Sequence, residues 1–125
     1  MKKFGICLVL VFAAGAVMAQ DWNLREQDIP LDQMQAQGLT AGSRLVFPDN
    51  GQSMFSVGGA YSYTFPGDGG TEFGRFTVEK DGRVCIDLYG GQSSCNLFVR
   101  RGELLLVITD RGDRWPIRIE MGLKP

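Results

Sequence analysis

The chain of 125 residues contains no histidine and only three cysteines. Histidine is the most frequent general base near neutral pH and a common metal ligand, so this chain has no histidine to fill either role. Two or three cysteines without histidine do not complete a tetrahedral zinc site. None of the serines stands in a Gly-x-Ser-x-Gly motif. The sequence therefore predicts no cofactor, no metal site and no catalytic residue.

There is also no excess of charge of one sign. The 13 lysines and arginines face 14 aspartates and glutamates, which leaves a formal net charge of −1. A chain with this balance has no electrostatic reason to bind nucleic acid or an anionic membrane surface. We therefore expect no nucleic-acid partner.

Long hydrophobic runs are absent except at the N-terminus. Met1-Lys2-Lys3 precedes the apolar run from Phe4 to Met18, which ends on a small residue at Ala19. The run is shorter than the roughly 20 residues that a spanning helix needs, and its layout is typical of a secretory signal peptide. We expect cleavage after residue 19, no integral membrane span, and a periplasmic or secreted protein that starts at Gln20. Losing Lys2 and Lys3 would shift the formal net charge from −1 to −3.

The rest of the chain is long enough for one domain and too short for two. We expect an N-terminal lead over residues 20–28, a single β domain with a leading helix over residues 29–120, and a tail over residues 121–125. The helix is predicted over residues 29–38. Pro30 suits its first turn and Gly38 suits a C-cap, while Leu31 and Met34 share one face.

After residue 42 the pattern changes to short apolar runs separated by Gly, Asp and Asn. Such residues supply the backbone angles of tight hairpins, and connections this short make neighbouring strands antiparallel. The predicted fold is mainly β, a small up-and-down, lipocalin-like barrel or a sandwich. Its eight predicted strands are Arg44–Phe47, Gln52–Val57, Ala60–Phe65, Glu72–Glu79, Arg83–Tyr89, Ser94–Arg100, Glu103–Thr109 and Arg114–Glu120.

Two cysteines remain after the predicted cleavage, because Cys7 lies in the signal peptide. In an oxidising compartment Cys85 and Cys95 are expected to form a disulfide. A hairpin centred on Gly90 places these two positions directly opposite each other, within reach of a disulfide bond.

The strand predicted over residues 103–109 is apolar on both faces. Leu104, Leu106 and Ile108 form the second face, which needs a cover if it is not to leave an exposed apolar patch. We expect the helix to cover it through Leu31 and Met34. A second subunit is the alternative, so the protein is expected to be a monomer or a weak homodimer.

Aromatic and basic side chains are the candidates for binding. The aromatic residues either line a small-molecule cavity or fill the core, and the arginines either form a patch or cover the wet face of strands. The residues selected as facing a ligand or partner are Tyr61, Tyr63, Arg75, Arg114 and Arg118.

Three other features would suggest chemistry or adhesion. Asp87, Glu79 and Glu103 are carboxylates that could serve a carboxylate-dependent hydrolase, yet no base–nucleophile pairing accompanies them. Residues 111–113 spell Arg-Gly-Asp and residues 67–74 form a glycine-rich run. Both lie where hairpins need turns, and the second lacks the Gly-Lys-Ser/Thr ending of a phosphate-binding loop.

The segment Asp81-Gly82-Arg83-Val84-Cys85, with Cys95 in the next strand, resembles a family of uncharacterised small exported bacterial proteins. The resemblance runs from Leu31 to about Ile119 and implies export and a disulfide-clasped barrel behind a short helix. The run from Ser56 to Tyr61 is also similar to a loop of periplasmic inhibitors of C-type lysozyme. The tryptophan-bearing strand of that family is missing after the loop.

These observations favour a non-enzymatic binding or accessory protein of the bacterial envelope. The expected partner is an envelope protein or a small apolar ligand. A lysozyme-inhibitor-like protein and a carboxylate-dependent hydrolase are the alternatives.

Overall fold

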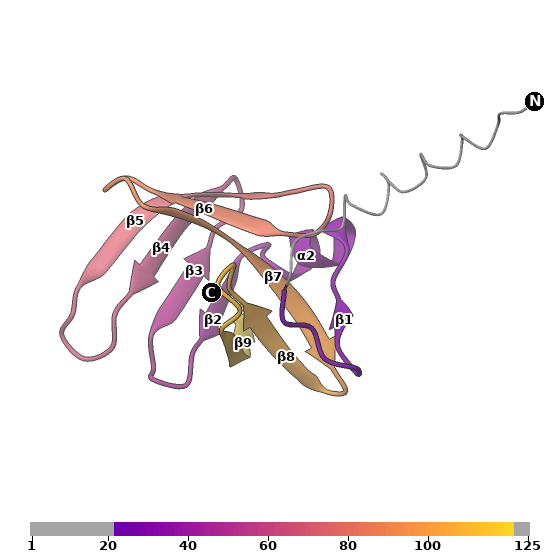
Figure 1. Cartoon of the computed structure of the whole chain (residues 1–125). Helices are drawn as coiled ribbons and strands as arrows, with labels where there is room; N and C mark the ends of the chain where they lie inside the picture. The colour runs from indigo at the N-terminus through magenta and orange to yellow at the C-terminus, as the bar shows by residue number, and fades with distance from the viewer. Residues whose placement is uncertain (1–21, 122–125) are drawn as a thin grey trace, which may run out of the picture.

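The computed structural model describes residues 22–121 and shows a closed eight-stranded antiparallel barrel with one additional strand and one short helix (Figure 1). Each of the eight barrel strands pairs with the next along the chain, and the last, Arg114–Met121, pairs back with the first, Ser43–Val46, which decides for a barrel over a sandwich. The predicted signal peptide and most of the predicted tail lie outside the described residues. The barrel strands are β2 (Ser43–Val46), β3 (Gln52–Phe55), β4 (Ala60–Thr64), β5 (Thr71–Val78), β6 (Val84–Leu88), β7 (Ser93–Arg101), β8 (Leu104–Ile108) and β9 (Arg114–Met121).

All eight predicted strands are confirmed to within two residues at each end. The strand that the sequence analysis missed is β1 (Ile29–Pro30), which pairs with β7 beyond the point where β6 separates from it. The pairs are Ile29 with Arg100 and Pro30 with Val99.

The helix, α2 (Gln33–Leu39), begins later than predicted. Asp32 is its N-cap and forms a capping box with Gln35, since each side chain accepts a hydrogen bond from the other residue's backbone N–H at 2.9 Å. Residues 29–30 therefore remain extended. The prediction of Gly38 as C-cap is wrong, because Thr40 is the C-cap and its hydroxyl donates to the carbonyl oxygen of Ala36 at 2.9 Å.

The helix closes one end of the barrel. Leu31, Ala36 and Leu39 are buried in the main core, among the inward-facing side chains of the barrel strands. The backbone N–H of Leu31 also donates to the carbonyl oxygen of Phe98 at 2.9 Å. Figure 1 shows α2 beside the barrel on the side away from the β2–β3 and β4–β5 turns.

The prediction that this helix covers the outer face of β8 is therefore wrong. Leu31 faces the barrel interior, and Met34 is 78% exposed. The outer faces of β7 and β8 form a second buried cluster, against which Trp22 packs. Leu104 lies outside this cluster and is exposed. The cover is the N-terminal lead, and the members of the cluster are Leu97, Val99, Leu106 and Ile108.

An ion pair and hydrogen bonds hold the lead against the barrel. The guanidinium of Arg114 donates to the carboxylate of Asp28 through its two terminal nitrogens, Nη1 and Nη2, at 2.7 and 3.1 Å. These side chains are only 7% and 0% exposed. Arg114 also donates to the carbonyl oxygen of Asn23 at 3.0 Å, and the Asn23 amide donates to the carbonyl oxygen of Gly112 at 2.9 Å. The lead is thus tied to the β8–β9 hairpin.

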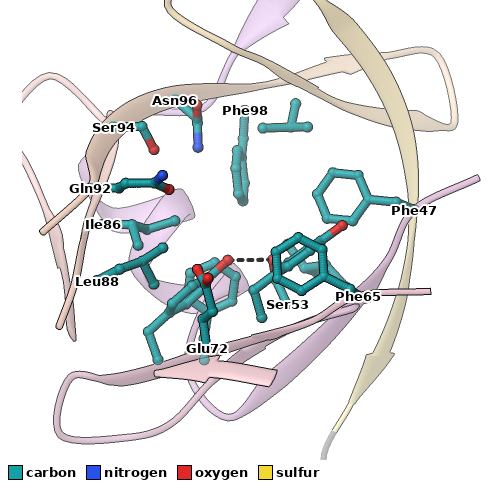
Figure 2. A pocket seen from close by; sticks show the side chains of 15 residues that line it. Phe47, Ser53, Phe65, Glu72, Ile86, Leu88, Gln92, Ser94, Asn96 and Phe98 are labelled. Atoms are coloured by element: carbon teal, nitrogen blue, oxygen red, sulfur yellow. Dashed lines mark hydrogen bonds between the residues drawn. The ribbon is translucent and has the colours of Figure 1, made fainter. Parts of the chain in front are cut away.

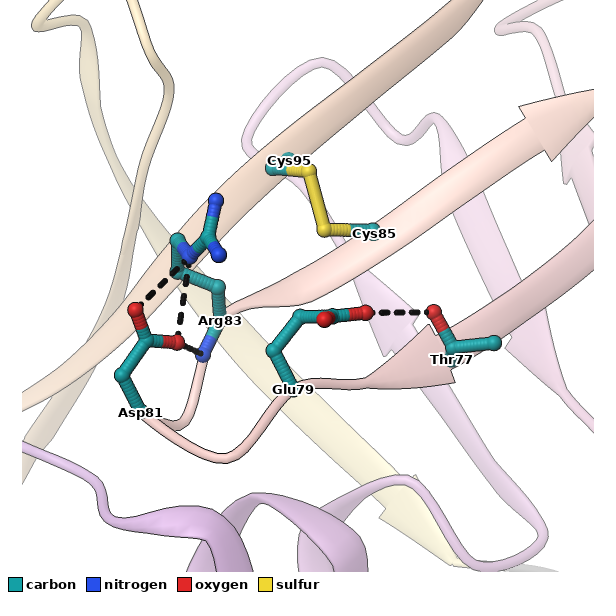
Figure 3. Close-up of a disulfide and its surroundings, with 6 residues drawn as sticks. All are labelled: Thr77, Glu79, Asp81, Arg83, Cys85 and Cys95. Carbon is teal, nitrogen blue, oxygen red and sulfur yellow. Dashed lines mark hydrogen bonds and ion pairs between the residues drawn. A yellow bond between two sulfur atoms is a disulfide. The ribbon is translucent and has the colours of Figure 1, made fainter.

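The predicted disulfide between Cys85 and Cys95 is confirmed (Figure 3). The two residues are directly paired between β6 and β7, with Cα atoms 3.9 Å apart. The N–H of Leu88 donates to the carbonyl oxygen of Gln92 at 2.8 Å, and hydrogen-bonded pairs alternate along antiparallel strands. Residues 85 and 95 therefore form a non-hydrogen-bonded pair, the kind in which side chains approach most closely.

Replacing both Cys85 and Cys95 with alanine is expected to lower the free energy of unfolding by roughly 2–3 kcal/mol, because the bond closes a short loop in the unfolded chain. The barrel should persist, since the β6–β7 backbone ladder does not depend on the bond. Urea unfolding with and without a reductant measures the effect. The reductant should shift the wild-type transition and leave that of the double variant unchanged; equal stability of the oxidised and reduced wild type would contradict the expectation.

Candidate ligand-binding site

The barrel interior changes character along its axis. On the inward face of β7, the residues from the helix end toward the other end are Phe98, Asn96 and Ser94. Phe98 belongs to the main core and borders a cavity that Asn96 and Ser94 also line. Glu72 on β5 also lines this cavity. The end opposite α2 is therefore an open mouth with polar side chains at positions where an ordinary core would be apolar.

The cavity at this mouth has a volume of about 260 Å³. Figure 2 shows Glu72 reaching toward it from one wall, with Gln92, Ser94 and Asn96 on the facing wall. Phe47 and Phe65 lie on the remaining side. The lining thus combines aromatic rings with several hydrogen-bonding groups.

A buried hydrogen bond forms part of the cavity floor. The hydroxyl oxygens of Ser53 and Tyr61 lie 2.7 Å apart, and both residues are buried. Burial raises the pKa of the Tyr61 hydroxyl to about 12, although the hydrogen bond to Ser53 acts in the opposite direction. Tyr61 therefore stays neutral at any physiological pH and orients a hydroxyl at the base of the cavity.

A second cavity of about 450 Å³ continues outward from the first. Phe47, Tyr63, Asn96 and Val107 line both of them. The ring of Tyr63 packs edge-on against Phe47 and Phe65, with centroids 6.1 and 4.9 Å apart. Trp115, which is 45% exposed, lines the outer cavity. Together the two cavities form one aromatic-lined depression at the barrel mouth.

Tyr63 stands at the junction of the two cavities. Burial raises the pKa of its hydroxyl, and the negative charge of Asp49 adds to the effect. Gly51 lies against the ring, because a Cβ atom at residue 51 would overlap the Tyr63 hydroxyl. A side chain at residue 51 would therefore displace the Tyr63 ring from its present position.

The structure brings together two of the five residues that the sequence analysis selected as facing a ligand or partner. Tyr61 and Tyr63 share the mouth. Arg75 is exposed on β5, and Arg118 is exposed on β9, where it pairs with Glu120 at 3.2 Å. Arg114 is buried and holds the lead through Asp28.

The other sequence features lie away from the mouth or in turns. Asp87 is exposed on β6 and lines a different cavity, beside the disulfide and Trp22. Glu79 accepts a hydrogen bond from the Thr77 hydroxyl at 2.9 Å, and Glu103 is exposed in the β7–β8 turn. The Arg-Gly-Asp tripeptide lies in the β8–β9 turn. Of the glycine-rich run, residues 67–70 lie in the β4–β5 turn and residues 71–74 belong to β5. Within residues 22–121 no cluster of three or more potential metal-ligating side chains occurs.

Several residues of the lining, aromatic as well as polar, were not selected from the sequence. The available signal was alternation. Glu72, Ser94, Asn96 and Trp115 stand in strands at the same parity as core residues but nearer the open end, while Phe47 and Gln92 lie just beyond a strand end. Recognising it requires knowing which strand ends share that end. The missed residues are Phe47, Glu72, Gln92, Ser94, Asn96 and Trp115.

No known protein family, curated protein or solved structure matches this chain significantly. The comparisons therefore support neither the resemblance to uncharacterised exported proteins nor the resemblance to lysozyme inhibitors. Among the described residues, no helix is long and apolar enough to cross a membrane. What is shown is a short helix with a disulfide-bonded β-barrel that has one end closed and the other open.

Proposed function

We propose that this protein is a non-enzymatic binding protein of the bacterial envelope that holds a small, largely apolar ligand in the open mouth of its barrel. The observation that carries the proposal is the contrast between the two barrel ends. Leu31, Ala36 and Leu39 fill one end with a packed core, while aromatic and polar side chains leave two connected cavities at the other. Concave, mostly apolar sites with a few polar groups are the usual form of small-molecule sites.

The envelope location rests on the predicted signal peptide and on the disulfide. A bond between Cys85 and Cys95 fits an oxidising compartment such as the periplasm or the cell exterior. The use of the barrel would be lipocalin-like, in that the strands supply a rigid wall and the ligand enters at one end.

A titration with N-phenyl-1-naphthylamine, a neutral aromatic dye that fluoresces in apolar sites, tests the proposal. Saturable binding to the wild type is expected. Replacing Ser94 with phenylalanine should weaken it by about tenfold or more, because the added ring fills a cavity built for a small molecule.

Ser93→Phe is the matched control. Ser93 directly precedes Ser94 on β7 and is paired with Asp87. Because side chains alternate along a strand, Ser93 points to the outer side of the barrel, as Cys95 does. Its substitution should leave dye affinity unchanged. Absence of saturable binding to the wild type, or equal binding by the two variants, would contradict the proposal.

A lysozyme-inhibitor-like function is the alternative, favoured by the β3–β4 turn. Val57 at this turn is 81% exposed, as a partner-contacting loop requires. Tyr61 of the same sequence run is buried and bonded to Ser53, however, so it does not reach a partner surface. Inhibition of a C-type lysozyme that is lost on Val57→Asp, with dye binding retained, would select this alternative.

A carboxylate-dependent hydrolase would have to use the carboxylates of the mouth. Glu72 lines the inner cavity and Asp49 the outer one. Asp49 already accepts a hydrogen bond from the backbone N–H of Gly51 at 2.8 Å, as a turn-forming residue does. This arrangement fits ligand contact better than a matched acid and base.

A further inference from the structure

The charged groups that line the mouth are of one sign. Glu72 belongs to the inner cavity and Asp49 to the outer cavity, and no lysine or arginine of the described residues lines either. The nearby Arg111 is exposed in the β8–β9 turn, where it faces Asp113 at 3.9 Å. The charged side chains that a ligand in the mouth would meet are therefore both carboxylates.

Glu72 is the more informative of the two carboxylates. Within residues 22–121 it has no ion-pair partner, although five other ion pairs involve arginines of the barrel and its turns. It stands on the inward face of β5, opposite Tyr63 on β4. Glu72 is exposed at the mouth, so its carboxylate is accessible to a cation supplied by a ligand.

Aromatic rings complete the surroundings of such a cation. Tyr63 packs edge-to-face against both Phe47 and Phe65 beside the inner cavity, and Trp115 lines the outer cavity. Ring faces attract cations, and cages of aromatic rings recognise quaternary ammonium groups in this way. Carbonyl oxygens on the side chains of Gln92 and Asn96 offer additional acceptors.

We infer that the ligand of the barrel mouth carries a compact organic ammonium group, which lies among the aromatic rings with its charge toward Glu72. The inference rests on the proposed binding function and specifies its ligand class. A neutral ligand of the same shape gains the apolar contacts but not the contact with Glu72. An anionic ligand is repelled by both carboxylates.

The test compares choline with 3,3-dimethylbutan-1-ol, which has the same shape but a carbon atom in place of the charged nitrogen. Binding is followed by NMR on the ¹⁵N-labelled protein with its disulfide formed, using the indole N–H of Trp115 and the backbone N–H groups of the mouth. Choline is expected to bind about tenfold more tightly than the alcohol. Glu72→Gln should lower choline affinity by about tenfold and leave alcohol affinity unchanged.

Asp87→Asn is the matched control, because it removes one negative charge from the outer face of the barrel. It should leave both affinities unchanged. Equal affinity for choline and the alcohol, no effect of Glu72→Gln, or an equal effect of Asp87→Asn would each overturn the inference about charge. The dye titration remains independent of it: dye binding without choline selectivity leaves the proposed function in place, whereas absence of dye binding overturns the proposed function itself.

Discussion

Replacing Gly82 with alanine is expected to lower the free energy of unfolding by roughly 3 kcal/mol, as a strained backbone and an overpacked contact combine. Gly82 has a φ of +93° in the β5–β6 turn, a conformation that L residues rarely adopt. A Cβ atom there would also overlap the carbonyl oxygen of Leu31, at the start of the segment that closes the barrel. Urea unfolding followed by circular dichroism measures the loss.

Two glycines of the β6–β7 turn separate the two causes. Gly91 has a φ of +107° but open space around its Cβ position, so Gly91→Ala should cost only about 1 kcal/mol. Gly90 has open space and no positive φ, and Gly90→Ala should change stability by less than about 0.5 kcal/mol. If Gly82→Ala costs no more than Gly91→Ala, the contact with Leu31 does not hold the closing segment in place.

The strands and their order could be predicted because their signal is local. Alternating or continuous apolar runs separated by Gly, Asp and Asn define hairpins, and short hairpin connections leave only antiparallel neighbours. The disulfide followed from the same argument, because residues equidistant from Gly90 face each other across the β6–β7 hairpin. Closure of the barrel could not be predicted in the same way, because it depends on pairing between β2 and β9. These strands are far apart in the sequence: the paired residues Arg44 and Glu120 are separated by 76 positions.

The segment before residue 40 was predicted less well because several nonlocal contacts decide its path. Trp22 stands in a polar run with no periodicity, and its role appears only when the outer faces of β7 and β8 are next to it. Ile29 and Pro30 form a strand only because β7 extends beyond β6. Asp32, by contrast, was a readable local signal, since an Asp three residues before a Gln is a capping box.

The candidate site was predicted in part. Tyr61 and Tyr63 were selected for their aromatic character, and they lie in the mouth. The arginines selected with them do not, because charge alone does not say which face of a strand a residue occupies. Arg114 has a structural contact, since its partner Asp28 lies in the lead, 86 positions away.

Replacing Arg114 with leucine is expected to lower the free energy of unfolding by roughly 3 kcal/mol at neutral pH, because it leaves a buried carboxylate without its partner. The Asp28 side chain is 0% exposed. The two hydrogen bonds that its carboxylate accepts from a charged side chain both come from the guanidinium of Arg114. Arg114→Leu combined with Asp28→Asn should recover a large part of the loss, because no unpaired charge then remains. Arg118→Leu is the control: its pair with Glu120 is 66% and 42% exposed, so the change should cost less than about 1 kcal/mol.

The effect of Arg114→Leu should also depend on pH in one direction. The hydrogen bond from Arg114 holds the pKa of Asp28 at about 2 in the folded protein, below its usual value of 3.8. A carboxyl group whose pKa is lowered by folding stabilises the folded state fully above its unfolded pKa, and the contribution is lost as the pH falls toward the folded value. The stability difference between wild type and Arg114→Leu should therefore be constant above pH 5 and should shrink between about pH 4 and pH 2. A difference that stays constant down to pH 2, or a loss no larger than that of Arg118→Leu, would show that this pair does not hold the lead over the outer face of β7 and β8.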